Sequence, residues 1–161
     1  MTGIDTNKTN AKTQEFSYEN FKKMVQKTKP LIGIDYGTVR IGIAVSDKEQ
    51  TIAQPFKIIS KIIELDDIVK SKDAGGFVIG MPFETSGNEG KTAGYVRLFA
   101  NRLNELYGLP ILFVDERHSS KYAEGNMRSI GVRDKKVKKT LDAKVARDLL
   151  QRVLNELKNI R

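Results

Sequence analysis

Residues 31–46 read LIGIDYGTVRIGIAVS, and this stretch decides the fold of the chain. Its first part, Leu31 to Asp35, is an apolar run of the length and type of a buried strand. Arg40 to Val45 is a second run rich in β-branched residues, and Gly37 lies between the two runs, where the chain has to turn. The stretch therefore predicts a β-hairpin at the start of a folded domain.

Downstream of the hairpin, strand patterns and helix patterns alternate. Pro55 interrupts the third strand pattern, which places that strand at a sheet edge. Alternation of this kind is typical of an α/β sheet. The expected elements are strands at 52–59, 77–80 and 111–114, and helices around 62–69, over 92–107 and from about residue 142 onward.

The length of the chain predicts one folded domain with an N-terminal extension. At 161 residues there is enough chain for one hydrophobic core. Residues 1–30 are the extension: about 14 polar, aperiodic residues that we expect to be disordered, then a short helix that Ser17 can cap. Residues 31–161 are then the domain itself.

Composition excludes several classes of protein. The hydrophobic fraction of 39% and charged fraction of 30% are ordinary for a soluble globular chain. The longest apolar runs are a few residues long, whereas a membrane span needs about 20, so we expect no membrane partner. The chain has no cysteine, which excludes disulfides and cysteine-ligated metals and favours a cytoplasmic location.

Positive charge is concentrated at the end of the chain. The net charge is +8, and the last 45 residues carry 13 of the 28 basic side chains but only 5 of the 20 acidic ones. A cluster of this kind attracts a polyphosphate backbone, although taken alone it is more often a solvated basic loop. Its densest part consists of Arg133, Lys135, Lys136, Lys138 and Lys139.

Three carboxylates stand where open α/β sheets place their ligands, beyond the carboxyl ends of the strands. Asp35 ends the first strand, Glu116 ends the strand at 111–114, and Asp142 opens the inward face of the last helix. Buried acids that converge on one point imply a bound cation. Oxygen ligands, with a single histidine in the chain, favour Mg²⁺ or Mn²⁺ over zinc. Next to a basic segment, these acids indicate a metal-dependent nuclease.

Several linked motifs resemble one family of proteins, the YqgF (RuvX) family. The resemblance extends from about Leu31 to Leu157, in the order that the family has. The motifs are the run from Ile34 to Asp47, then Gly80-Met81-Pro82, Gly87, the run from Asp115 to Ser120, and the run from Leu141 to Ala146.

The resemblance implies a ribonuclease H-like fold, a mixed sheet flanked by helices. It also implies a nuclease, with two activities known in the family: resolution of Holliday junctions and maturation of the 5′ end of 16S ribosomal RNA. Asp35, Glu116 and Asp142 would be the catalytic, metal-binding acids, and Arg40 and Arg117 would contact phosphate or form structural ion pairs. His118 departs from the family pattern, which usually has an apolar or aromatic residue there.

Alternatives of other classes stay open. The residues around Gly37 also resemble the first phosphate loop of actin-type ATPases, but this chain is less than half as long as those proteins. A nuclease fold that kept only its basic surface would be a non-catalytic nucleic-acid-binding module. The sequence does not separate structured RNA from branched DNA as the substrate, and symmetric cleavage of a junction would require a homodimer.

Overall fold

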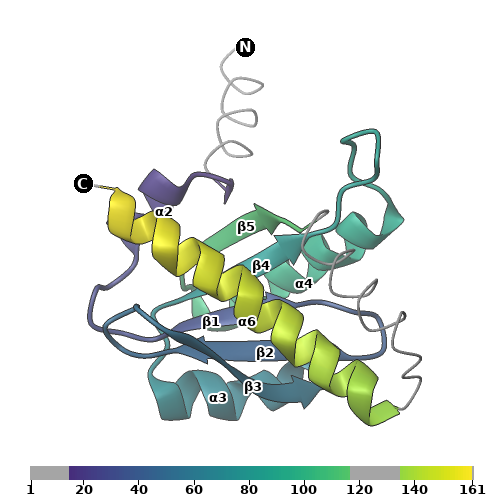
Figure 1. Ribbon diagram of the computed structural model, residues 1–161, viewed down its shortest axis with the longest axis horizontal. Coiled ribbons are helices and arrows are strands. Elements are labelled where there is room, and N and C mark those ends of the chain that lie inside the picture. The colour runs from purple at the N-terminus through teal and green to yellow at the C-terminus, as the bar shows by residue number, and fades with distance from the viewer. Residues whose placement is uncertain (1–14, 117–134, 161) are drawn as a thin grey trace.

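The computed structural model describes residues 15–116 and 135–160, with side chains of the second segment from Asp142 onward. Five strands form one sheet in the order β3-β2-β1-β4-β5 (Figure 1). The elements are α2 (Tyr18–Met24), β1 (Leu31–Asp35), β2 (Ile41–Ser46), β3 (Ala53–Ile59), the 3₁₀ turn η1 (Ile62–Glu64), α3 (Leu65–Lys72), β4 (Gly76–Met81), α4 (Lys91–Tyr107), β5 (Ile111–Asp115) and α6 (Lys135–Asn159).

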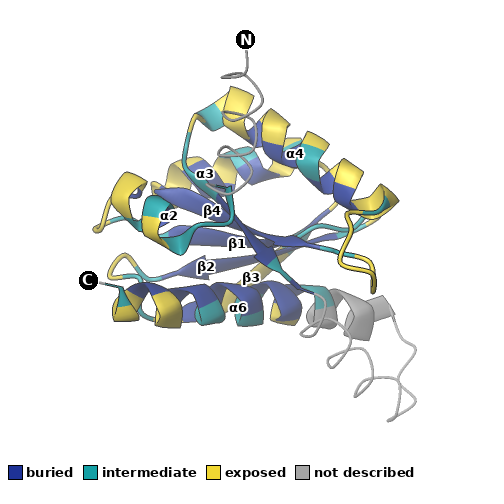
Figure 2. Cartoon of the chain, turned by 90° about the horizontal axis from the view of Figure 1, so that it is seen from above, coloured by how far each residue is buried: buried dark blue, intermediate teal, exposed yellow. Residues whose placement is uncertain are grey.

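The sheet is mixed. Strand β1 pairs antiparallel with β2, as the predicted hairpin requires, and β2 pairs antiparallel with β3. On its other side β1 pairs parallel with β4, which in turn pairs parallel with β5. Helix α6 covers one face of this sheet, and α3 and α4 cover the other (Figure 2). The predicted α/β sheet flanked by helices is therefore confirmed.

Strand β3 lies at the edge of the sheet, where Pro55 predicts it. Proline has no backbone N–H to donate, so an edge position leaves no ladder bond unmade. Across from it, the pairing register of β2 shifts between Ile43 and Ala44. The proline that interrupts the strand pattern in the sequence therefore coincides with an irregularity in the pairing of β2 and β3.

Alternate residues of the central strands divide the sheet into a large face and a small face. The large face packs against α3 and α4 and carries Ile32, Ile34, Ile41, Ile43, Val45, Phe77, Ile79 and Met81. The small face packs against α6, where a Cβ added to Gly33 would lie 2.8 Å from the Leu150 Cβ. Its residues from the three strands are Leu31, Gly33, Asp35, Gly42, Ala44, Ser46, Gly76, Val78 and Gly80.

The two long helices are amphipathic. Helix α4 buries Ala93, Val96 and Leu103 on the large face and ends at Gly108, whose φ of 61° is left-handed. Helix α6 was expected to begin near Asp142 but begins at Lys135, so Asp142 lies two turns inside it. In the part of the chain that is described, no helix has both the length and the apolar character to cross a membrane.

The helix preceding the domain packs onto the same core. Ser17 caps α2 as expected, because its Oγ accepts a hydrogen bond from the Asn20 N–H at 3.2 Å. Phe21 and Val25 are buried among the residues that join α6 to the small face. Lys22 donates to the Leu157 carbonyl at 2.6 Å, near the C-terminal end of α6. The expected disorder of the first 14 residues lies outside the described part.

Candidate active site

Asp35 is the last residue of β1 and stands between two glycines. In the β1–β2 ladder it pairs with Gly42. On the other side Ile34 pairs with Ile79 of β4, so Gly80 follows at the level of Asp35. Residues directly across a sheet point to the same face, and here that is the small face under α6. The Asp35 carboxylate is partly exposed and has a side-chain-free position on each side.

Gly42 brings the backbone of α6 directly onto the sheet. A Cβ at this position would lie 2.5 Å from the carbonyl carbon of Asp142 and 3.0 Å from the Ala143 nitrogen. Only glycine therefore allows this approach. The Asp142 backbone is thereby held over the residue that pairs with Asp35.

Gly80 makes room for the third acid. A Cβ at Gly80 would lie 2.9 Å from the carboxyl carbon of Glu116, so the Glu116 carboxylate packs directly over β4. Glu116 follows β5, is 7% exposed, and donates its backbone N–H to the Met81 carbonyl at 3.3 Å. The backbone thus brings the three predicted acids to one end of the small face, with Asp35 between the other two.

The side chains of these acids are not gathered around one point. Asp142 Oδ2 accepts a hydrogen bond from Arg40 Nε at 3.0 Å, and the two form an ion pair. Among the described residues, no group of three or more Asp, Glu or His side chains is arranged to hold a metal ion. The family resemblance implies that Arg40 contacts phosphate or forms a structural ion pair, and the structure shows the ion pair.

The residues nevertheless fit a hard divalent cation in kind and in backbone placement. All three side chains offer carboxylate oxygens, the ligands that Mg²⁺ and Mn²⁺ prefer. At Gly42 and Gly80, the missing Cβ lets the Asp142 backbone and the Glu116 carboxylate lie next to the strand positions that flank Asp35. A cation held by all three acids would require Asp142 to share or leave Arg40.

The loop at 82–90 continues from β4 at the same end of the sheet. Phe83 and Glu89 form an isolated β-bridge, and Arg97 of α4 binds both Glu89 oxygens, at 2.5 and 2.7 Å. Arg97 also contacts Glu15 at 2.9 Å. The hydrogen bonds to Glu89 are the main cause of a raised pKa at Arg97. Sequence reasoning missed Arg97 because a basic residue on an amphipathic helix gives no signal of its partners.

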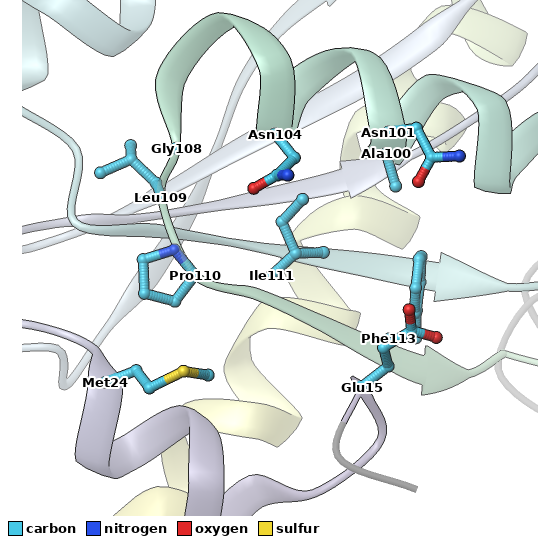
Figure 3. Close-up of a pocket in the computed structure, with 10 residues that line it drawn as sticks. All are labelled: Glu15, Met24, Ala100, Asn101, Asn104, Gly108, Leu109, Pro110, Ile111 and Phe113. Atoms are coloured by element: carbon cyan, nitrogen blue, oxygen red, sulfur yellow. The ribbon is translucent and has the colours of Figure 1, made fainter. Parts of the chain in front are cut away.

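A separate pocket lies at the opposite end of β5. It has a volume of about 390 Å³ and is lined by residues of α4, β5 and the segment joining them, with Met24 and Glu15 at its side (Figure 3). Asn101 and Asn104 are the amides in its wall. The pocket is bordered by Ile111, at the start of the strand that Glu116 follows, so it is distinct from the acid site.

Most of the predicted nucleic-acid-binding residues lie outside the described part. This applies to Arg117 and Arg133, and to the side chains of Lys135, Lys136, Lys138 and Lys139. The backbone of the four lysines is helical and forms the start of α6, where a basic loop was the plainest expectation. Asp148, on the same helix as Asp142, pairs with Arg147 at 3.1 Å.

The chain is similar in sequence to one known protein family and to several named relatives. A family model described as "RuvX: Holliday junction resolvase" matches residues 29–156. A relative from Maridesulfovibrio salexigens named "Putative pre-16S rRNA nuclease" is 38% identical over 127 residues, which cover 75% of this chain and 94% of the relative. A relative of the same name from Rickettsia bellii is 34% identical over 148 residues, with coverage of 88% and 96%.

A solved structure is similar in fold. It is RuvC of T. thermophilus in complex with a Holliday junction substrate, with a TM-score of 0.51 and 13% sequence identity. The alignment covers 83% of this chain and 98% of that one. The likeness confirms the expected ribonuclease H-like fold. With the family match over most of its length, the chain belongs to the RuvX nuclease family.

Proposed function

We propose that this protein hydrolyses phosphodiester bonds in structured RNA, at the 5′ end of precursor 16S ribosomal RNA, with Mg²⁺ or Mn²⁺ held by Asp35, Glu116 and Asp142. The observation that carries the proposal is the row of Gly42, Asp35 and Gly80 across the small face, because the Asp142 backbone lies on one glycine and the Glu116 carboxylate on the other. The relatives named as pre-16S rRNA nucleases support the choice of RNA.

The three acids differ in their exposure to solvent, which suggests different roles in binding a cation and a substrate. A bound divalent cation supplies Lewis acidity and an activated water. Glu116 is buried, whereas Asp35 and Asp142 are partly exposed, so the last two are the acids that a substrate would reach first. If the three carboxylates turn toward one point, they repel one another, and a divalent cation bound between them would offset this repulsion.

Basic residues next to the acids would hold the nucleic-acid backbone. Arg40 already lies at the acid site. Helix α6 begins at Lys135, seven residues before Asp142, which is about 10 Å along a helix. We propose that Lys135, Lys136, Lys138 and Lys139, with Arg117 and Arg133, contact phosphates at the rim of the site, giving affinity without sequence preference.

A Holliday junction is the second candidate substrate, because the matching family model carries that description. Symmetric cleavage of a four-way junction would need two copies of the site, hence a homodimer. RNA maturation needs only one. Measurements of substrate preference and of oligomeric state therefore both distinguish junction resolution from RNA maturation.

The experiment compares both substrates with one preparation. Purified protein is incubated with Mn²⁺ and either an RNA spanning the 5′ end of precursor 16S rRNA or a four-way DNA junction. Asp35→Asn, Glu116→Gln and Asp142→Asn should each reduce cleavage to background. Asp148→Asn is the matched control, since it removes a carboxylate from the same helix at a residue paired with Arg147.

The outcomes separate the classes. Cleavage of RNA that needs all three acids supports the proposal, and cleavage of the junction alone favours the resolvase. Binding of either nucleic acid without cleavage, by wild type and variants alike, would instead identify a non-catalytic module. Wild-type rates in any one acid variant would remove that residue from the site.

A further inference from the structure

Arg40 pairs with one of the three acids across a long separation in the chain. It precedes β2, two residues before Gly42, and its Nε lies 3.0 Å from Oδ2 of Asp142, 102 residues later. The exposed fractions of the two side chains are 30% and 26%. The pair is therefore partly buried, so the charges are screened less than those of a surface ion pair.

The backbone beneath both partners is fixed. The Asp142 carbonyl rests on Gly42, and the following residues Ala143 and Ala146 are buried. On the Arg40 side the turn is tight, because a Cβ on Gly37 would lie 2.5 Å from the Arg40 carbonyl oxygen. Helix and turn cannot move apart easily, so side-chain rotation is the freedom that remains for breaking the pair.

The ion pair and a cation site are alternative arrangements of the same carboxylate. With Asp142 bound to Arg40, the described acids form no group of three that could hold a metal. Without a cation, the guanidinium offsets the negative charge of Asp142. A divalent cation would supply that positive charge itself and would compete with Arg40 for Asp142.

We propose that Arg40 is an exchangeable counter-ion of the acid site: it holds Asp142 when no divalent cation is bound, and cation binding releases it to contact a phosphate of the substrate. The proposal rests on the metal-dependent nuclease proposed above. Arg40 is thus a positioning residue for Asp142 in the cation-free protein and a binding residue in the loaded one.

Arginine suits both states. Its planar guanidinium binds carboxylates and phosphates with the same donors and stays charged at any working pH. Once Asp142 turns to a cation, the charge of Arg40 lies beside the cleavage site without a partner of its own. Cation binding should therefore raise the affinity for nucleic acid, and by linkage nucleic acid should raise the affinity for the cation.

The test measures Mn²⁺ affinity directly, by isothermal titration calorimetry of the full chain without nucleic acid. Arg40→Gln should bind Mn²⁺ about threefold to tenfold more tightly than wild type, because the competing cation is gone. Arg102→Gln is the matched control: it also removes one positive charge, but from an exposed pair with Glu105 on α4. Its Mn²⁺ affinity should equal that of wild type.

A second measurement follows nucleic-acid binding to uncleaved substrate. Here a substrate analogue with non-cleavable backbone linkages prevents cleavage, so that all three acids stay intact, and Ca²⁺ replaces Mn²⁺ as the probe cation. Addition of Ca²⁺ should increase the affinity of a chain with Arg40 more than that of one with Arg40→Gln. Arg40→Lys, which keeps the charge without the Nε donor, should fall between the two.

The possible results separate the inference from the function on which it rests. Unchanged or weaker Mn²⁺ binding by Arg40→Gln would overturn the inference, and weaker binding would show that Arg40 supports Asp142 as a ligand. Absence of Mn²⁺ binding by wild type and variant would overturn the proposed metal-dependent nuclease together with it. If Arg40→Gln does not fold, equal Mn²⁺ affinity of Arg40→Lys and wild type is the overturning result.

Discussion

The two faces of the sheet differ in side-chain size, and they serve different purposes. The large face buries Ile32, Ile34, Phe77 and Ile79 under α3 and α4, where each side chain fills core volume. On the small face, Gly42 and Gly80 carry no side chain, and a helix backbone and a carboxylate take the space. Both faces bury a core, but at one end of the small face glycines replace larger side chains and let the acids approach the sheet.

The difference teaches where a substitution should affect stability and where it should affect the site. Truncation of a side chain on the large face removes packing contacts but leaves the acids in place. An addition on the small face pushes α6 and Asp142 away from Asp35. We expect four substitutions to test this contrast, from the largest change in the free energy of unfolding to the smallest.

Phe77→Ala should give the largest loss of stability. Phe77 is fully buried on β4 and its ring lies 6.0 Å from that of Tyr107. Truncation of such a residue costs about 3–5 kcal/mol of the free energy of unfolding, measured by urea denaturation. Mn²⁺ affinity below the melting temperature should stay that of wild type. Loss of Mn²⁺ binding by the folded variant would mean that the two faces are not separable.

Gly42→Ala should cost less stability but damage the site. The added methyl group overlaps the Asp142 carbonyl, and overpacking of this kind costs about 1–3 kcal/mol. Cleavage and Mn²⁺ binding should both fall strongly, because α6 has to move. Ile43→Val is the matched control on the next residue, which points to the large face. It should cost about 0.5–1.5 kcal/mol and leave Mn²⁺ binding intact.

Much of this arrangement could be predicted from local sequence. The hairpin follows from two β-type runs around Gly37, and the edge position of β3 follows from Pro55. The predicted start of α6 near Asp142 was wrong because the lysines before Asp142 carry no apolar periodicity. Lysine is nevertheless a good helix former, and neither Gly nor Pro interrupts the segment, so the helix extends back to Lys135.

The sequence predicts which three acids form the candidate site but not how their side chains are arranged. Asp35 and Glu116 are predicted from strand ends and Asp142 from the first inward residue of the last apolar helix stripe, and the structure brings the three residues to one end of the small face without gathering their side chains. The pairing of Arg40 with Asp142 depends on how α6 crosses β2, a contact between residues 102 positions apart that no local pattern encodes. Arg97 was missed for the same reason, since Glu89 and Glu15 lie in separate segments.

Tyr107→Phe should change the pH dependence of stability on the large-face side. The Tyr107 hydroxyl donates to Asp66 Oδ1 at 2.9 Å; burial first, and this hydrogen bond second, raise the pKa of Tyr107 to about 12. A folded-state pKa above the unfolded value near 10 gives stability that is present below pH 10 and lost between pH 10 and 12. Urea denaturation at pH 8, 10 and 11 should show a smaller decline for Tyr107→Phe than for wild type. An equal decline would contradict a role for this bond.

Gly94→Ala should have the smallest effect, and its sign should be opposite to that of Gly42→Ala. Gly94 lies inside α4 on the solvent side, and a Cβ there would meet nothing within 4 Å. Alanine restricts the unfolded chain and favours the helix, so the free energy of unfolding should rise by about 0.5–1 kcal/mol. The same methyl group then stabilises where the glycine has open space and destabilises where a helix backbone rests on it. Urea denaturation of both variants checks this, and a loss of stability in Gly94→Ala would show that an interaction at the outer side of α4 requires the bare backbone.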